Sequence, residues 1–147
     1  MGRSKVVFLA LALAVWAILA SSVAVYYYVR YSEASTHLQA LEEATVKVGV
    51  VIDYGNGTVE EFEGLILDVE GATALNALLL VARVEYKVYP FGVFVESING
   101  VKNSKELNMW WLYYVRQPGG EEKMPEVGAD QYKLKTGETV IWRYSKL

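Results

Sequence analysis

The stretch SINGVKNSKELNMWWLYYV, from Ser97 to Val115, places two tryptophans and two tyrosines in five consecutive positions just beyond an Asn-Gly pair. Side chains along a β-strand point alternately to the two faces of the sheet. A strand here would carry Trp111, Tyr113 and Val115 on one face and Trp110, Leu112 and Tyr114 on the other. Both faces are apolar, which is typical of a strand inside a sheet rather than at its edge.

The two faces of this strand predict two different roles. A domain of about 100 residues buries one modest core, so the face with Trp111 is expected to be core and the opposite face to lack a covering layer. An exposed aromatic patch indicates contact with a partner. We therefore predict a partner-binding surface at the start of the loop 116–128 and on this second face: Phe91, Trp110, Tyr114 and Arg116.

Short strands with turn signals between them are predicted on both sides of this stretch. Residues 46–62 are expected to form two strands joined at Asn56-Gly57, because both positions of such a turn need a positive φ angle. A Pro-Phe-Gly break at residues 90–92 separates two further strands. Residues 132–144 are expected to form a final hairpin that turns at Thr136-Gly137.

A single helix interrupts the strands, in the segment GATALNALLLVARV, residues 71–84. Its apolar residues recur at the spacing of one helical face, which predicts three turns with one buried stripe. The stripe consists of Leu75, Leu78, Leu79 and Ala82. One helix packed on one mixed β-sheet is a two-layer α+β domain.

An apolar run precedes the domain. Val6 to Val29 is 24 residues long and contains no charge, proline or glycine. As a helix it would be about 36 Å long, enough to cross a hydrocarbon core of about 30 Å. Arg3 and Lys5 precede the run, and Arg30 alone follows it before acidic residues appear. This charge bias predicts a single-pass anchor in the lipid bilayer of the cell membrane, with a cytoplasmic N-terminus.

The chain is thus predicted to have three parts: residues 1–30 as N-terminus and transmembrane anchor, 31–45 as a helical stalk, and 46–147 as an extracytoplasmic domain. Two alternatives to a retained anchor stay open. A signal peptidase cleaves after small residues, and Ala20-Ser21-Ser22 has that pattern, although cleavage there would leave an apolar N-terminus. The other alternative is pilin-like processing near Arg3-Ser4.

The composition argues against several classes of function. The chain has no cysteine, which excludes disulfides, a thiolate nucleophile and a lipid-modified cysteine. Residues 46–147 carry 11 Lys and Arg against 14 Asp and Glu without a basic stripe, which argues against nucleic acid as a partner. The single histidine, His37, lies in the predicted stalk, so no Ser-His-Asp arrangement is expected. We expect no enzyme activity, no cofactor and no metal site.

One modification site is predicted from the first hairpin. Asn56-Gly57-Thr58 matches the acceptor sequence for N-glycosylation. The turn would be exposed outside the cell, so Asn56 is a candidate glycosylation site.

Four segments in this order resemble the transcobalamin-like C-terminal domain family: GATALNALL, GVFVESINGV, WLYYV and DQYKLKTGETVIWRY. The resemblance covers residues 46–147 and implies a β-grasp-like sheet, as in the small domain of vitamin B12 carriers and in stand-alone modules of prokaryotic surface proteins. The sequence departs from the family after Val115, where Arg116-Gln117-Pro118 replaces the usual Asn-Gly.

Two hypotheses for function follow. In the first, the protein is a non-catalytic accessory or structural subunit that docks on a protein partner in a membrane or surface assembly. In the alternative, implied by the resemblance, it binds a small cobamide-type ligand. In vitamin B12 carriers a larger helical domain holds most of the ligand, and no such domain is present here. Without a concave pocket, a lone sheet would bury too little of a large ligand, so the first hypothesis is preferred.

Overall fold

The computed structural model describes residues 2–147 and contains two compact units, residues 1–42 and 43–147. Each unit is described by itself. The structure does not describe Met1 or the side chains of Arg3, Ser4, Val6, His37 and Glu42. The predictions made for these residues therefore fall outside the described part of the chain.

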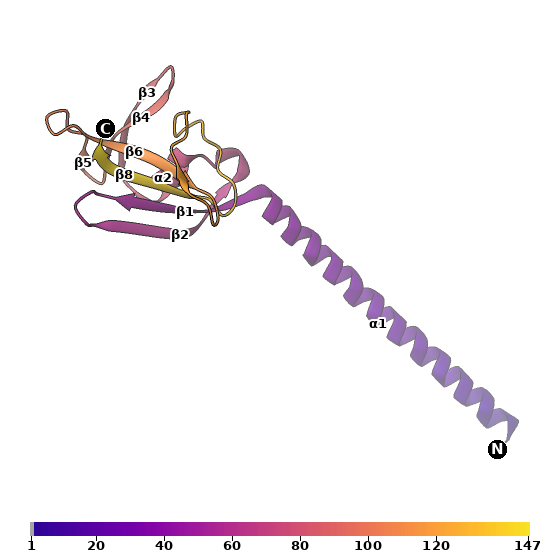
Figure 1. The fold of residues 1–147 in the computed structure, drawn as a ribbon. Helices are drawn as coiled ribbons and strands as arrows, with labels where there is room; N and C mark the ends of the chain where they lie inside the picture. The colour runs from indigo at the N-terminus through magenta and orange to yellow at the C-terminus, as the bar shows by residue number, and fades with distance from the viewer. Residues whose placement is uncertain (1) are drawn as a thin grey trace. The chain divides into compact units, whose positions relative to one another are not determined.

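The first unit consists of one long helix, α1 (Arg3–Ala44), drawn in indigo to purple in Figure 1. Its segment from Val7 to Leu41 is long and apolar enough to cross a membrane, judged by length and composition. The hydroxyl groups of Ser21 and Ser22 donate to the carbonyls of Ala17 and Ile18, at 2.7 and 2.8 Å, so these polar side chains are satisfied within the helix. The helix continues without a break through the segment predicted as a stalk.

The second unit contains eight strands, a 3-10 turn and a helix. They are β1 (Thr45–Asp53), β2 (Val59–Asp68), η1 (Val69–Gly71), α2 (Ala74–Val81), β3 (Val84–Tyr89), β4 (Gly92–Ile98), β5 (Val101–Lys102), β6 (Met109–Arg116), β7 (Glu122–Lys123) and β8 (Thr139–Lys146). Five strands form a mixed sheet in the order β2-β1-β8-β6-β7, in which only β1 and β8 are parallel. The predicted α+β class is confirmed.

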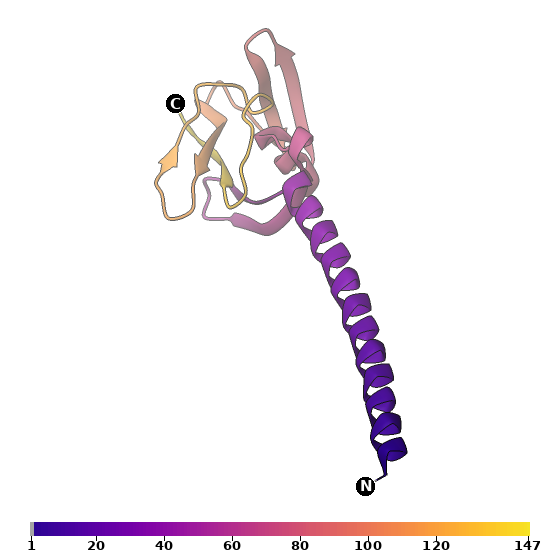
Figure 2. The same cartoon turned by 90° about the vertical axis from the view of Figure 1, so that its right-hand side faces the viewer.

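The remaining strands form a separate sheet in the order β3-β4-β5. Within it, β3 and β4 make a long hairpin that extends away from the five-stranded sheet (Figures 1 and 2). The sequence predicted these strands and the break at residues 90–92, but not their separation from the main sheet.

Helix α2 packs on β1, β2 and β8. Thr73 caps its N-terminus by accepting a hydrogen bond from the backbone N–H of Asn76, at 3.1 Å. The helix ends at Val81 because Ala82 is extended, so it has about two turns rather than the three predicted. The buried stripe is also different: Leu75 and Leu78 are buried, whereas Leu79 is 41% exposed.

Strand β6 shows the predicted alternation. Its register with β8 places Trp111 opposite Tyr144 and Tyr113 opposite Trp142, all on the core side, and Trp111 is 3% exposed. Trp110, Leu112 and Tyr114, on the opposite face, are half-buried. The strand is less central than expected. On the side away from β8, Met109 bridges to Ser104, and Val115 and Arg116 pair with β7, so the edge between these positions has no strand partner.

The predicted C-terminal hairpin is wrong. Residues 132–138 form a turn-rich segment rather than a strand, and the backbone N–H of Leu134 donates to the carbonyl of Ala72, at 2.8 Å. Strand β8 instead pairs with β1 and β6. Both partners are distant in sequence, so the local pattern of alternation could not identify them.

The two neighbouring tryptophans of β6 should differ in their contribution to stability. Trp111 packs against Tyr54 and Tyr144 and donates its Nε1–H to the carbonyl of Val101, at 2.8 Å. We expect Trp111→Ala to lower the free energy of unfolding by about 3–5 kcal/mol. Replacing the half-buried Trp110 by Ala should lower the free energy of unfolding by only about 1–2 kcal/mol. Denaturant unfolding of the full chain measures both values, and equal losses would contradict the assignment of the faces.

Candidate functional site

Four aromatic side chains form a continuous series across the two sheets, which we call the aromatic row. Phe91, at the tip of the β3–β4 hairpin, stacks on Tyr89 with ring centroids 5.2 Å apart and an interplanar angle of 4°. Tyr89 meets Phe94 edge to face at 6.5 Å, and Phe94 meets Trp110 at 6.1 Å. The row thus joins two of the predicted partner-binding residues, Phe91 and Trp110.

Sequence reasoning missed Tyr89 and Phe94, which connect the predicted pair. The signal was present in the alternation along β3 and β4. Lys87 pairs with Phe94 and Tyr89 pairs with Gly92, so Tyr89 and Phe94 are diagonal neighbours on the same face of the hairpin. Phe91 is 68% exposed, so one end of the row is open to solvent.

The other two predicted residues, Tyr114 and Arg116, lie further along the same face of β6. The guanidinium carbon of Arg143 lies 5.2 Å from the centre of the Tyr114 ring, a cation–π arrangement. Arg143 also forms ion pairs with Asp53 at 3.3 Å and Glu122 at 3.1 Å, and Arg116 approaches Glu122 at 3.9 Å. The polar network and the aromatic row therefore occupy different parts of this face.

Asn56 lies exposed in the turn between β1 and β2. Its Oδ1 accepts a hydrogen bond from the backbone N–H of Thr58, at 2.9 Å, which stabilises the turn. Glycosylation of this residue stays a prediction.

A groove lies between β4, the open edge of β6 and the loop 124–129, and we call it the β4–β6 groove. Its volume is about 310 Å³. The side chain of Asn103 bridges β4 and β6, since its Nδ2 donates to the carbonyl of Val95 and its Oδ1 accepts from the backbone N–H of Trp111, both at 2.8 Å. The lining is mainly apolar: Phe91, Val93, Phe94, Val95, Trp111, Leu112, Tyr113, Met124, Pro125, Glu126, Val127, Gly128, Ala129 and Trp142.

Two glycines allow the loop to close against the hairpin. Gly92 has φ +119°, and a Cβ atom there would lie 2.9 Å from Asp130 Oδ1 and 3.0 Å from the Cα atom of Gly128. Asp130 Oδ1 accepts a hydrogen bond from the backbone N–H of Val93, at 2.7 Å, and the hydroxyl of Tyr113 donates to the carbonyl of Val127. The expectation that the domain lacks a concave pocket is therefore wrong.

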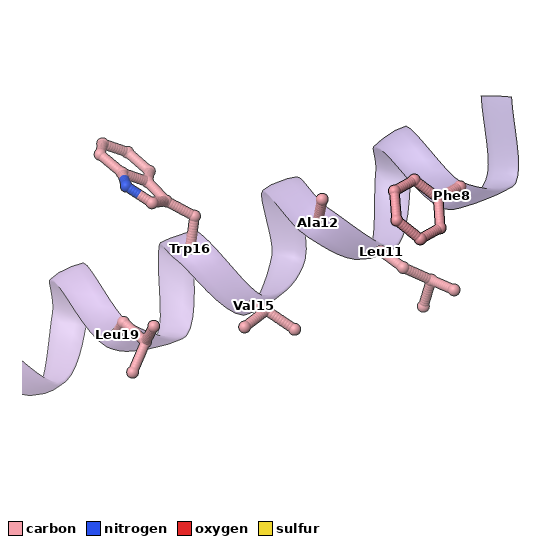
Figure 3. Close-up of a pocket in the computed structure, with 6 residues that line it drawn as sticks. All are labelled: Phe8, Leu11, Ala12, Val15, Trp16 and Leu19. Atoms are coloured by element: carbon pink, nitrogen blue, oxygen red, sulfur yellow. The ribbon is translucent and has the colours of Figure 1, made fainter. Parts of the chain in front are cut away.

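An exposed apolar surface lies on α1. Figure 3 shows the side chains that line it, Phe8, Leu11, Ala12, Val15, Trp16 and Leu19, projecting from one helix with no second wall. Such a surface is the kind that lipid chains cover, so it is not taken as a ligand site. Among the described residues, no three His, Cys, Asp or Glu side chains gather as a metal site would require.

The sequence matches a family model described as "Domain of unknown function (DUF4430)" over residues 71–146, just over half of the chain. The chain belongs to the DUF4430 family. The DUF4430 segment runs through α2 and β3 to β8, so it contains the aromatic row and the β4–β6 groove but not β1 and β2. No curated protein matches the chain.

Solved structures resemble this DUF4430 protein at low sequence identity. One is a candidate metal-binding protein from Ruminococcus gnavus ATCC 29149, with 18% identity and a TM-score of 0.56, where the match covers 69% of this chain and 98% of that one. Another is haptocorrin in complex with Cbi, with 16% identity and a TM-score of 0.58, where the match covers 69% of this chain but only 25% of haptocorrin. The predicted resemblance is confirmed at the level of a transcobalamin-like fold.

The groove residue Tyr113 predicts a loss of stability in alkali. Burial, followed by the nearby charges of Tyr132 and Asp130, raises the pKa of Tyr113 to about 12, whereas an unfolded tyrosine ionises near pH 10. Between these pH values the folded state retains a proton that the unfolded state has lost. The contribution of Tyr113 to the free energy of unfolding is therefore complete below about pH 10 and falls as the pH rises towards 12. The loss of stability is at most about 2.7 kcal/mol, and solvent screening reduces it.

The measurement is thermal unfolding of the full chain between about pH 9 and 11.5. We expect Tyr113→Phe to be less stable than wild type at pH 9, since it loses the bond to Val127, but to lose less further stability as the pH rises. Identical slopes for the two proteins would contradict the assignment.

Proposed function

We propose that the protein is a membrane-anchored, non-catalytic binding module. Helix α1 holds it in the cell membrane, and the extracytoplasmic domain docks on a protein partner of a membrane or surface assembly through the aromatic row. The observation that carries the proposal is the exposure of aromatic rings at a hairpin tip, where Phe91 is 68% and Tyr89 41% exposed. Aromatic side chains of this kind dominate the energy of protein interfaces.

The proposed orientation rests on the charges that flank the apolar run. Lys5 precedes the membrane-length segment and Arg30 follows it, with Glu33 close behind. Counting the N-terminal amino group and Arg3, the N-terminal flank is the more positive, and positively charged flanks stay in the cytoplasm. The N-terminus is therefore assigned to the cytoplasm and residues 31–147 to the other side.

The absence of cysteine from the sequence allows a direct test of orientation. Gly2→Cys places a single thiol at an exposed position before the apolar segment, and Glu121→Cys places one at an exposed position after it. A membrane-impermeant maleimide should label Glu121→Cys in intact cells and Gly2→Cys only after permeabilisation. The reverse pattern would overturn the orientation, and release of the labelled domain into the medium would show cleavage rather than anchoring.

The partner surface has a sharp test because Phe91 contributes little to the core. We expect Phe91→Ala to leave the unfolding midpoint unchanged while weakening partner binding by at least about 30-fold, the loss typical of an interface hot spot. The matched control is Ile66→Ala on β2, at the other end of the five-stranded sheet, since Ile66 is 66% exposed and lies outside the aromatic row. The measurement is crosslinking and co-purification in mild detergent. Equal retention of partner by both variants would exclude the row as the interface.

A second candidate function is binding of a cobamide-type ligand. It is supported by the likeness to haptocorrin in complex with Cbi and by the β4–β6 groove. At about 310 Å³ the groove lies at the lower end of ligand-site volumes, so a large ligand would remain mostly outside it. Retention of a stoichiometric corrinoid by the purified chain, with no protein partner, would reverse the ranking.

A further inference from the structure

One residue that lines the β4–β6 groove carries a polar group that the fold leaves without a partner. Trp142, on β8, lines the groove and is 2% exposed. Among the described residues, its Nε1 is a buried side-chain nitrogen with no hydrogen-bond partner. Native proteins satisfy nearly all buried donors, because an unpaired one loses its hydration without compensation. The exception indicates an acceptor that comes from outside the chain.

The other tryptophans of the domain make this exception informative. Trp111 donates its Nε1–H to the carbonyl of Val101 at 2.8 Å, and Trp110 donates to Asn108 Oδ1 at 3.0 Å. Both donors are therefore satisfied, including that of the half-buried Trp110. Trp142 is held firmly, with its ring stacked on Tyr113 at 5.3 Å, so its unpaired donor does not reflect a loosely packed side chain.

The open edge of β6 adds a second donor to the groove wall. The backbone N–H of Trp111 points away from β8, since it donates to Asn103 Oδ1. Backbone groups of alternate residues in an antiparallel strand point the same way, so the N–H of Tyr113 is directed to the same edge. Strand β7 begins to pair only at Val115. Tyr113 therefore presents its N–H where the groove lies.

The lining defines the charge of the occupant. Phe94, Leu112 and Met124 contribute apolar surface, and the one charged lining residue, Glu126, is exposed. A charged ligand would lose hydration on entering such a groove without a buried charge of opposite sign to replace it. The occupant is thus neutral, and the volume of about 310 Å³ limits it to a compact molecule.

We propose that the β4–β6 groove is a binding site for a compact, neutral, largely apolar molecule that carries a hydrogen-bond acceptor such as a carbonyl oxygen. The Nε1–H of Trp142 donates to this acceptor, and the apolar walls enclose the body of the molecule. The site goes beyond the docking role, because it needs no protein partner and its hydrogen-bond donor is the buried Trp142. Phe91 and Phe94 of the aromatic row contribute to its lining, but Tyr89 and Trp110 do not.

The test uses two probes that differ only in the acceptor. Acetophenone carries a carbonyl oxygen, and isopropenylbenzene has a CH₂ group in its place. The full chain, labelled with ¹⁵N at its four tryptophans, is studied in lipid nanodiscs by NMR of the indole N–H groups. We expect acetophenone to shift the Trp142 signal in a saturable way, and isopropenylbenzene to bind about two- to tenfold more weakly. The signal of Trp16, in α1, reports partition of either probe into lipid.

Two variants separate hydrogen bonding from enclosure. Trp142→Phe keeps an aromatic ring and loses only a donor that has no partner in the fold. It should therefore reduce the affinity for acetophenone to that for isopropenylbenzene. Binding to this variant is measured at the Met124 methyl signal. Met124→Trp, at a position that is 51% exposed, should fill the groove and weaken the binding of both probes at least tenfold. Binding to this variant is measured at the Trp142 signal.

The proposal is overturned if acetophenone leaves the Trp142 signal unchanged, or if the two probes bind wild type and Trp142→Phe equally. A cross-peak from the Trp142 N–H to a long-lived water that acetophenone fails to displace would also overturn it. Trp110→Ala removes a ring of the aromatic row that does not line the groove, so it should weaken partner docking but retain probe binding. Failure of the docking role and failure of the groove site therefore give different results.

Discussion

The parallel pairing of β1 with β8 is the constraint on which the rest of the domain depends. It joins Gly49–Asp53 to Thr139–Arg143, about 90 residues further along the chain, and its core side supplies Val50, Ile52, Val140 and Trp142, all buried. Helix α2 covers this pair, β2 extends it on one side and β6 on the other. The strands approach closely at Gly49, where a Cβ atom would lie 3.1 Å from Thr139 Oγ1.

The turn before β8 is built to make this pairing possible. Glu138 is buried and accepts a hydrogen bond from the backbone N–H of Lys135 at 2.9 Å and from the hydroxyl of Tyr132 at 3.3 Å. Its own carbonyl accepts from the N–H of Gly49 at 3.0 Å, and Gly137 donates to the carbonyl of Lys47 at 2.8 Å. A buried carboxylate with these partners fixes the point at which β8 enters the sheet.

The sequence predicted what depends on local periodicity. Alternation along β6 separated Trp111 from Trp110, and turn residues placed the β1–β2 and β3–β4 hairpins. The sequence failed where partners are distant: it paired residues 132–135 with β8, whereas Leu134 bonds to Ala72. It foresaw the two ends of the aromatic row. The β4–β6 groove, however, is made by β4, β6, β8 and the loop 124–129, which only the tertiary fold brings together, and the unpaired nitrogen of Trp142 has no signature in a sequence.

The junction between the two units has a mechanical consequence. Helix α1 ends at Ala44 and β1 begins at Thr45, so the two elements are consecutive in the chain. Tension applied along the helix therefore enters β1 through a single peptide bond. Because β1 is hydrogen-bonded to β2 on one side and to β8 on the other, a pull along the strand loads many hydrogen bonds in shear at once instead of opening them one after another. The chain thus enters the domain through a strand that has hydrogen-bonded neighbours on both sides.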